Sequence, residues 1–262
     1  MLNKKKNEIK FSKYQIKGPD YHYKDIDSSK IATFNAYVFA RYQIELELIS
    51  LVIKNKYNNK NYVKILDVGC GDAVLFYLLN QKIKNLKLKF FGIDSSGSAL
   101  SVARKKNSKG IFKKADLYNI PFEDNYFDMI ISSDVIEHIV EAKKMLSEIK
   151  RVGKNNSIII IGTPIRYTEL PRDKMHYYEF FPQEFKDLLN DFFSDIKIIQ
   201  SHKLRYFLFY NQILSIFSIN KPFFRYLINI LTVYFKRNPF LKIKTTDNEI
   251  YSYMFGIGKI KK

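Results

Sequence analysis

Residues 63–73, VKILDVGCGDA, decide the fold of this chain. A short, mostly hydrophobic run, VKILDV, leads into Gly69 and Gly71, which are separated by one residue. A helical stretch from Ala73 to Asn80 follows. Glycines at a strand end let the backbone turn sharply and approach a ligand, and the next helix offers free N–H groups. The same corner also occurs without a ligand, so the surrounding pattern has to decide its meaning.

Outward from this corner, β-rich runs alternate with helical stretches. The further β-rich runs are residues 88–94, 111–116, 127–132 and 157–162. The helical stretches between them are Ser98–Lys106 and Ile139–Val152. An amphipathic helix at Pro182–Phe193 and two closing strands, 195–200 and 250–260, complete the pattern. Strands alternating with helices predict an α/β fold with a doubly wound, largely parallel sheet covered on both faces.

Three acidic residues stand where strands of such a sheet end. Asp67 precedes the first glycine, Asp94 ends the second strand and Asp116 ends the third. A carboxylate at the end of the second strand can accept hydrogen bonds from both hydroxyls of a ribose. The third glycine of a nicotinamide-binding G-x-G-x-x-G pattern is replaced by Val74, which argues against a dinucleotide cofactor.

These motifs resemble the class I S-adenosylmethionine-dependent methyltransferases, specifically the type 11-like members. The resemblance covers roughly residues 60–200 and the last strand. It rests on VKILDVGCGDA, FFGIDSS, KKADLYNIPFEDNYFDMIISSDVIEHI and KNNSIIIIGTP. It implies a Rossmann-like seven-stranded sheet of order 3-2-1-4-5-7-6, with strand 7 antiparallel. The departure is Ala73, where many members have a third glycine.

The resemblance also implies the cofactor, S-adenosylmethionine, its product, S-adenosylhomocysteine, and a set of binding residues. Gly69, Cys70 and Gly71 would line the methionine part of the cofactor, and Asp134 would sit near the same end. Asp67 is a further expected cofactor-binding residue. The ribose would be held by Asp94 and Ser95, and the adenine would be flanked by Asp116 and Leu117.

Two histidines are the candidate catalytic residues. His138 lies four residues past Asp134, on the helix expected after the fourth strand, and would share its face. His176 lies in the loop after the fifth strand, where acceptor-facing residues are common. Each histidine also has an interpretation without a catalytic role, in which His138 is packed in the fold and His176 is solvated. His22 is a weaker third candidate for catalysis. Four scattered histidines and one cysteine show no metal-ligand spacing, so we expect no metal site.

Composition places the chain among folded proteins. Its 262 residues include 46% hydrophobic and 27% charged residues, with 44 basic and 26 acidic side chains for a net charge of +18. One cysteine, no secretory signal and no apolar run of spanning length favour the cytoplasm. We expect a basic, flexible lead-in at residues 1–30 and a single methyltransferase domain at 31–262, beginning with a helix at Ser29–Lys56.

A helical insertion at about residues 203–246 interrupts the closing strands. Residues 196–246 hold nine Lys or Arg and no Asp or Glu. Two helices are expected there, each with a narrow polar stripe. The stripes are Asn211, Ser215 and Ser218 in the first, and Arg225, Asn229, Thr232 and Lys236 in the second. A helix that is apolar around most of its circumference must be buried in the protein, against a partner or at a lipid interface.

The function predicted from these features is methyl transfer to a small-molecule or glycan acceptor, at oxygen. The alternative is a methyltransferase at the membrane surface, in peripheral contact through residues 203–246, that acts on a lipid-linked or quinone-type acceptor. A nucleic-acid methyltransferase or a non-catalytic binding module is less favoured, because an AT-rich genome alone can supply much of the lysine.

Overall fold

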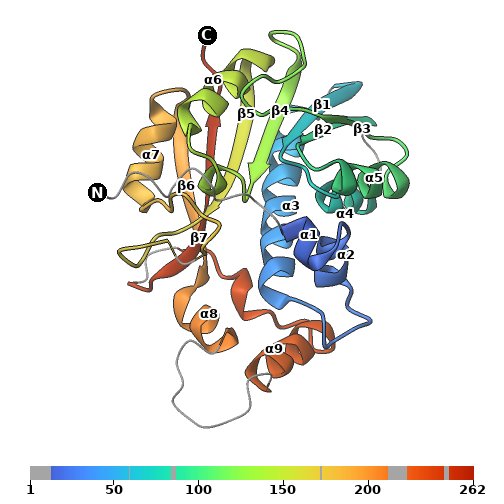
Figure 1. Cartoon of the computed structure of the whole chain (residues 1–262). Helices are drawn as coiled ribbons and strands as arrows, with labels where there is room; N and C mark the ends of the chain where they lie inside the picture. Colours follow the sequence, from blue (N-terminus) through green and yellow to red (C-terminus); the bar gives the residue numbers. More distant parts are fainter. Residues whose placement is uncertain (1–12, 59, 84–86, 172, 212–222, 245–247) are drawn as a thin grey trace.

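The computed structural model describes residues 13–58, 60–83, 87–171, 173–211, 223–244 and 248–262, which form a seven-stranded sheet flanked by helices (Figure 1). The strands are β1 (Tyr62–Val68), β2 (Lys87–Asp94), β3 (Ile111–Lys114), β4 (Phe127–Ser133), β5 (Gly153–Pro164), β6 (Ser194–Lys203) and β7 (Tyr251–Lys259). Their order is β3-β2-β1-β4-β5-β7-β6, and β7 runs antiparallel to both neighbours. The predicted topology is confirmed.

Helices cover the sheet on both faces, as the alternation predicted. They are α1 (Lys13–Lys17), α2 (Tyr21–Ile26), α3 (Ala36–Lys56), α4 (Val74–Lys82), α5 (Gly97–Lys106), α6 (Ala142–Val152), α7 (Pro182–Asn190), α8 (Leu204–Tyr210) and α9 (Phe223–Val233). Short 3-10 turns lie at Ile136–His138 and Pro239–Leu241. Helices α3, α4 and α5 pack on one face and α6 and α7 on the other, each with its own hydrophobic core.

The central strands supply both cores because successive side chains of a strand point to opposite faces. In β1, Val63 and Ile65 join the core under α3 and α4, whereas Leu66 and Val68 join the core under α6. All four are fully buried, which explains why the run reads as continuously hydrophobic. Lys64 and Asp67 are the two charged residues within this run, and Asp67 lies on the α3 side at the end where the strand meets the glycine loop.

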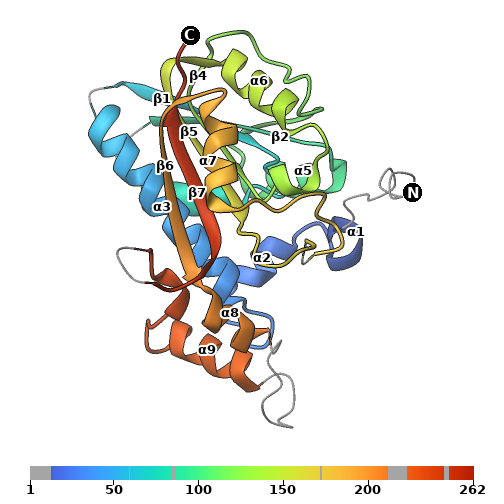
Figure 2. The same ribbon diagram turned by 90° about the vertical axis from the view of Figure 1, so that its left-hand side faces the viewer.

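The N-terminal segment differs from the expected flexible lead-in. Residues 1–12 lie outside the described part of the chain, but residues 13–26 form α1 and α2, whose Tyr14 and Tyr21 are buried. Helix α2 lies beside α3, and α1 lies farther from α3 (Figure 2). The helix expected from Ser29 begins only at Ala36, because the side chain of Asn35 accepts a hydrogen bond from the Val38 N–H and caps it there.

The insertion before β7 forms a small lobe at one end of the molecule (Figures 1 and 2). Helices α8 and α9 and the turn at Pro239–Leu241 pack against the start of α3 around buried Phe34, Tyr210 and Phe240. Residues 212–222 and 245–247 lie outside the described part of the chain. The predicted stripe residues Ser215 and Ser218 belong to the first of these segments. Among the described helices, none has the length and apolar character needed to cross a membrane.

Candidate active site

A cavity of about 1460 Å³ opens at the carboxyl ends of β1, β2 and β4. Its walls come from α1, α2 and α3 on one side and from the loop after β5 on the other. Pockets that bind one drug-sized ligand measure roughly 300–1,000 Å³, so this cavity has room for a cofactor and an acceptor together. The predicted site residues that line it are Asp67, Gly69, Cys70, Asp94, Ser95, Asp116, Leu117, Asp134, His138 and His176.

Gly71 is the predicted residue that does not line the cavity. Its N–H donates instead to Asp94 Oδ2 at 2.9 Å, which ties the glycine loop to the end of β2. Gly69 and Gly71 have φ values of +79° and +55°, so the loop uses the left-handed region that glycine adopts freely. A Cβ on Gly69 would lie 2.3 Å from Val135 Cγ2, so the fold itself requires a glycine there.

The buried carboxylates of the cavity lie close to one another on the side of the glycine loop. Asp94 accepts hydrogen bonds from the N–H groups of Gly71 and Ser96, and burial raises its pKa. Burial, followed by the nearby Glu45 and Asp94, raises the pKa of Asp67 well above its usual range. Burial also raises the pKa of Glu45 to about 7, although Ser133 donates to it. A cationic ligand would stabilise the ionised form of all three.

Glu45 is a site residue that the sequence analysis missed. It lies in the middle of α3, is fully buried and has one carboxylate oxygen, Oε2, without a hydrogen-bond partner among the described residues. An acid among the buried apolar residues of a helix was the available signal, because such a group is rarely buried without a partner.

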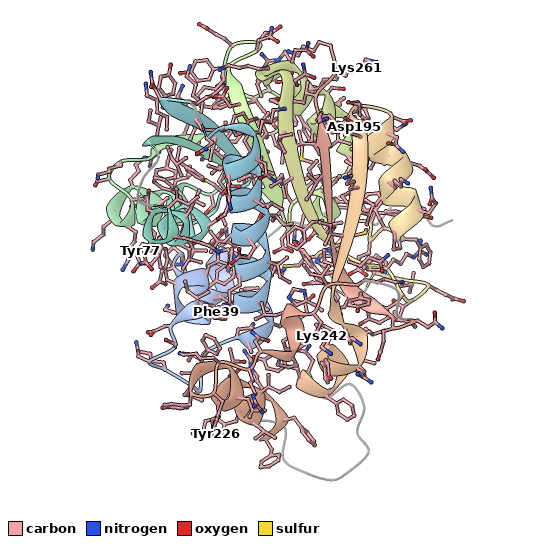
Figure 3. The ribbon with its side chains drawn as sticks, turned by 180° about the vertical axis from the view of Figure 1, so that it is seen from behind. Phe39, Tyr77, Asp195, Tyr226, Lys242 and Lys261 are labelled. Atoms are coloured by element: carbon pink, nitrogen blue, oxygen red, sulfur yellow. The ribbon has the colours of Figure 1, made fainter. Side chains whose placement is uncertain are left out.

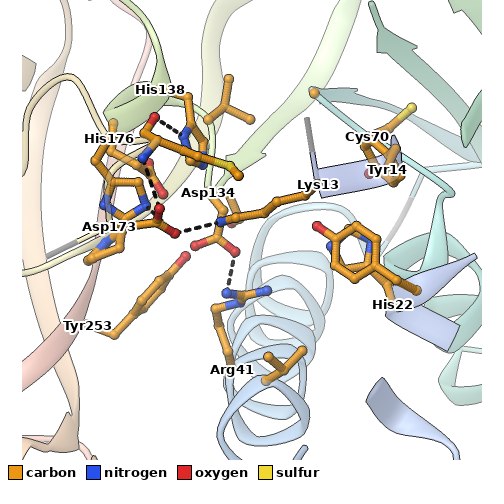
Figure 4. Close-up of a pocket in the computed structure, with 18 of the residues that line it drawn as sticks. Lys13, Tyr14, His22, Arg41, Cys70, Asp134, His138, Asp173, His176 and Tyr253 are labelled. Carbon is orange, nitrogen blue, oxygen red and sulfur yellow. Dashed lines mark hydrogen bonds and ion pairs between the residues drawn. The ribbon is translucent and has the colours of Figure 1, made fainter. Parts of the chain in front are cut away.

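Asp134 is held toward α3 by an ion pair with Arg41, a second residue that the sequence analysis missed (Figure 4). Arg41 is almost fully buried, and its guanidinium lies 5.3 Å and 5.5 Å from the rings of Tyr42 and Tyr253. The pair therefore forms a charged part of the cavity wall.

The two candidate catalytic histidines face each other, with ring centroids 4.7 Å apart (Figure 4). His138 Nδ1 lies 2.8 Å from the carbonyl of Met175, which can only accept, so Nδ1 carries the proton and Nε2 is the basic nitrogen. Burial lowers the pKa of His138 to about 4 and keeps it neutral. His176 is buried rather than solvated, and its Nδ1 lies 2.6 Å from Glu179 Oε1.

The expected placement of His138 on a helix is wrong. His138 ends a 3-10 turn, and α6 starts only at Ala142. The turn also brings Glu137 beside the histidines, so that ligand atoms of Glu137, His138 and His176 all lie within 4.8 Å of one another. We expected no metal-ligand grouping because the histidines are far apart in sequence, and the tertiary fold has assembled one of a type that divalent cations use.

The N-terminal helices cover the glycine loop. The hydroxyl of Tyr14 lies 1.7 Å from where a Cβ of Gly71 would be, and His22 Nδ1 lies 3.0 Å from Asp72 Oδ1. Lys13 forms an ion pair of 3.3 Å with Asp173 in the loop after β5 (Figure 4). The segment that was expected to be flexible thus closes one side of the cavity, and the weak candidate His22 holds it to the loop.

Comparisons with known proteins agree on the family. A family model described as a methyltransferase domain matches residues 59–212. An uncharacterized protein of Methanocaldococcus jannaschii is 32% identical over 182 residues, which cover 69% of this chain and 72% of that protein. A ubiquinone/menaquinone biosynthesis C-methyltransferase of Campylobacter jejuni is 30% identical over 137 residues, 51% of this chain and 56% of the enzyme. The match thus spans about half the length of that C-methyltransferase.

Solved structures share the fold at low sequence identity. The phosphoethanolamine N-methyltransferase 2 of Haemonchus contortus, solved with S-adenosylmethionine, has a TM-score of 0.60 at 16% identity, over 97% of this chain and 60% of that one. The 4+2 cyclase SpnF has a TM-score of 0.55 at 17% identity, over 84% of this chain and 82% of that one. With the matched domain and the sheet order, these findings identify the chain as a member of the class I S-adenosylmethionine-dependent methyltransferases.

Proposed function

We propose that this methyltransferase methylates a hydroxyl oxygen of a small-molecule or glycan acceptor. The observation that carries this proposal is a neutral imidazole, His138, in the same cavity as the glycine loop and Asp94. A hydroxyl is a weak nucleophile and gains from a group that takes its proton during transfer. The cavity is also large enough to hold both reactants.

The cofactor end of the cavity is proposed to be the glycine-loop side. Asp94 would accept hydrogen bonds from the ribose hydroxyls, and Asp116 and Leu117 would flank the adenine. Glu45 and Asp67 would face the positive charges of the methionine part, which suits buried carboxylates whose pKa values are raised. The bound cofactor supplies an electrophilic methyl group on a sulfonium.

The acceptor end is proposed to be the His138 and His176 side. His138 Nε2 takes the hydroxyl proton as the O–CH3 bond forms and the S–CH3 bond breaks, which leaves S-adenosylhomocysteine and the methyl ether. The Met175 carbonyl fixes the tautomer that makes Nε2 the acceptor. His176, held by Glu179, packs edge-on against His138 and fixes its orientation. Most of the rate would come from aligning the two reactants.

The test is methyl transfer from labelled S-adenosylmethionine to a panel of sugars, glycans and phenols, with His138→Gln beside the wild type. We expect an O-methylated product and a kcat about 100-fold lower in the variant, in line with the usual contribution of a general base. Affinity for S-adenosylhomocysteine should be unchanged, and Glu141→Gln, an exposed position, is the control. A kcat within threefold of wild type, or methylation at carbon, would overturn the proposal.

A lipid-linked or quinone-type acceptor is the second candidate. It is supported by the similarity to the quinone C-methyltransferase and by the apolar wall that Val38, Phe207 and Leu208 give the cavity. Demethylated quinols and polyprenyl-linked sugars added to the same acceptor panel test it. Preferential turnover of an acceptor with a long apolar chain over its water-soluble analogue supports this candidate, and equal turnover excludes it.

A further inference from the structure

Helix α9 packs into the protein with its polar side. The buried residues of this helix are Ile228, Asn229 and Thr232, two of which belong to the polar stripe recognised in the sequence. Asn229 Nδ2 donates to the carbonyls of Ile31 and Phe34 at 3.0 Å and 2.7 Å, and Asn229 Oδ1 accepts from the Tyr210 hydroxyl at 2.9 Å. The inner side of the helix is thus fixed by hydrogen bonds that satisfy buried backbone groups.

The outer side of the same helix is apolar. Phe223, Tyr226 and Leu227 are 53%, 49% and 40% exposed, at spacings that place them on one face. Tyr234 and Phe235, just past the helix end, are 69% and 63% exposed. Amphipathic helices of globular proteins normally show the opposite arrangement, with the apolar side inward. A run of exposed aromatic side chains of this kind marks an interaction site.

The charge around this face has one sign. Residues 204–211 and 223–244 contain no Asp or Glu, and their cations are Arg205, Arg225, Lys236, Arg237, Lys242 and Lys244. Lys236, Arg237, Lys242 and Lys244 are exposed. Figure 3 shows Tyr226 at the outer edge of the insertion lobe, at the opposite end of the molecule from Lys261. Aromatic and aliphatic side chains bordered by cations are typical of protein surfaces that bind anionic lipid.

We propose that this surface, made of the outer face of α9 and residues 234–244, docks onto an anionic lipid bilayer. The exposed rings would enter the boundary between headgroups and acyl chains, and the cations would contact the headgroups. A second copy of the chain is a poorer occupant, because it would bring the same exposed cations Lys236, Arg237, Lys242 and Lys244 to the interface. The proposed contact is a peripheral one, since none of the described helices is both long and apolar enough to cross a bilayer.

The docking surface is connected to the cavity through α8. Phe207 and Leu208 of α8 line the cavity, and the next residue, Phe209, is 37% exposed. An acceptor with an apolar chain would therefore leave the bilayer at the side of the molecule where the cavity has an apolar wall. This last step rests on the proposed lipid-linked acceptor, whereas docking itself does not.

The experiment is vesicle flotation of the full chain with phosphatidylcholine alone and with 30% phosphatidylglycerol. We expect binding to the anionic vesicles only, weakened by salt because charge contributes to it. Tyr226→Ser combined with Leu227→Ser and Tyr234→Ser should lower partitioning at least tenfold. Leu51→Ser combined with Val140→Ser, which alters exposed apolar residues elsewhere, should leave it unchanged.

Titration with S-adenosylhomocysteine shows that each variant is folded and keeps the docking result separate from the proposed chemistry. The proposal is overturned if the wild type binds neither vesicle or both equally, or if the triple Ser variant floats like the wild type. It is also overturned if the surface substitutions instead abolish binding of single-stranded RNA or self-association on gel filtration, because the occupant would then be a nucleic acid or a second copy.

Discussion

Replacing Asp94 should remove most of the affinity for the cofactor without unfolding the protein. In the proposed role each carboxylate oxygen accepts from one ribose hydroxyl, and a hydrogen bond to a charged group contributes about 1.5–3 kcal/mol. Loss of two such bonds in Asp94→Ala amounts to about 3–6 kcal/mol. At about 1.4 kcal/mol per decade this is a loss of affinity of at least about 100-fold.

The substitution has a second effect, because Asp94 also accepts from the N–H groups of Gly71 and Ser96. Asp94→Asn separates the two effects, since the amide oxygen keeps one of these acceptors. Burial raises the pKa of Asp94, so removing its charge offsets part of the cost of the lost acceptor, and the thermal stability of Asp94→Asn should fall only slightly.

The assay is calorimetric titration with S-adenosylmethionine and S-adenosylhomocysteine, with thermal unfolding of the same samples. The control is Asp195→Asn, an exposed acid on β6 that pairs with Lys259. Micromolar affinity in the wild type and the control, and loss in both Asp94 variants, is the expected result. A folded Asp94→Ala protein that binds within threefold of wild type would refute the assignment of Asp94 to the ribose.

Three further outcomes follow from the geometry. Gly69→Ala should lower the free energy of unfolding by about 2 kcal/mol or more in chemical denaturation, because φ is +79° and the new Cβ would meet Val135, whereas Gly97→Ala, at a helix start with open space, should not. Glu45 binds a proton up to a pKa of about 7 when folded but only to about 4.5 when unfolded, so the stability gained from this proton is present at low pH and is lost as pH rises from about 4.5 to 7. We therefore expect the free energy of unfolding of Glu45→Gln, relative to that of the wild type, to be up to about 3 kcal/mol higher at pH 8 than at pH 5 in chemical denaturation. The same difference between the two proteins at both pH values would contradict this explanation. Lys13→Gln removes the half-buried ion pair with Asp173. Hydrogen exchange of the α1 amides should become faster and cofactor affinity should fall a few-fold. Unchanged amide exchange in α1 would contradict this role of the ion pair.

The sequence was sufficient where the physical signal is local. The sheet order was inferred from the motifs of the family, and the strand positions came from hydrophobic runs such as Val63–Val68. The acids Asp67 and Asp94 were found because carboxyl ends of neighbouring parallel strands meet at one edge of the sheet. Alternation of strands and helices was enough to predict that both faces would be covered, and the structure confirms it.

The tertiary structure decided what depends on contacts between distant segments. Arg41 and Glu45 face the cavity only because α3 packs across the sheet, and their position among apolar residues of the helix indicates burial but not that they line a cavity. The expected position of His138 was wrong because a 3-10 turn replaced the first turn of α6. The same turn brought Glu137 next to His176, which sequence spacing had no means of showing.

The sequence alone therefore determined the family, the topology and the strand ends at which the cofactor is proposed to bind. The family and the sheet order follow from the resemblance of its motifs, and the strand ends follow from hydrophobic runs and from a backbone turn that glycine permits. Only the tertiary structure showed that the N-terminal helices and the insertion form parts of the cavity wall. It also decided which side of α9 faces water, because Asn229 on its inner side donates hydrogen bonds to buried carbonyls of the segment that precedes α3.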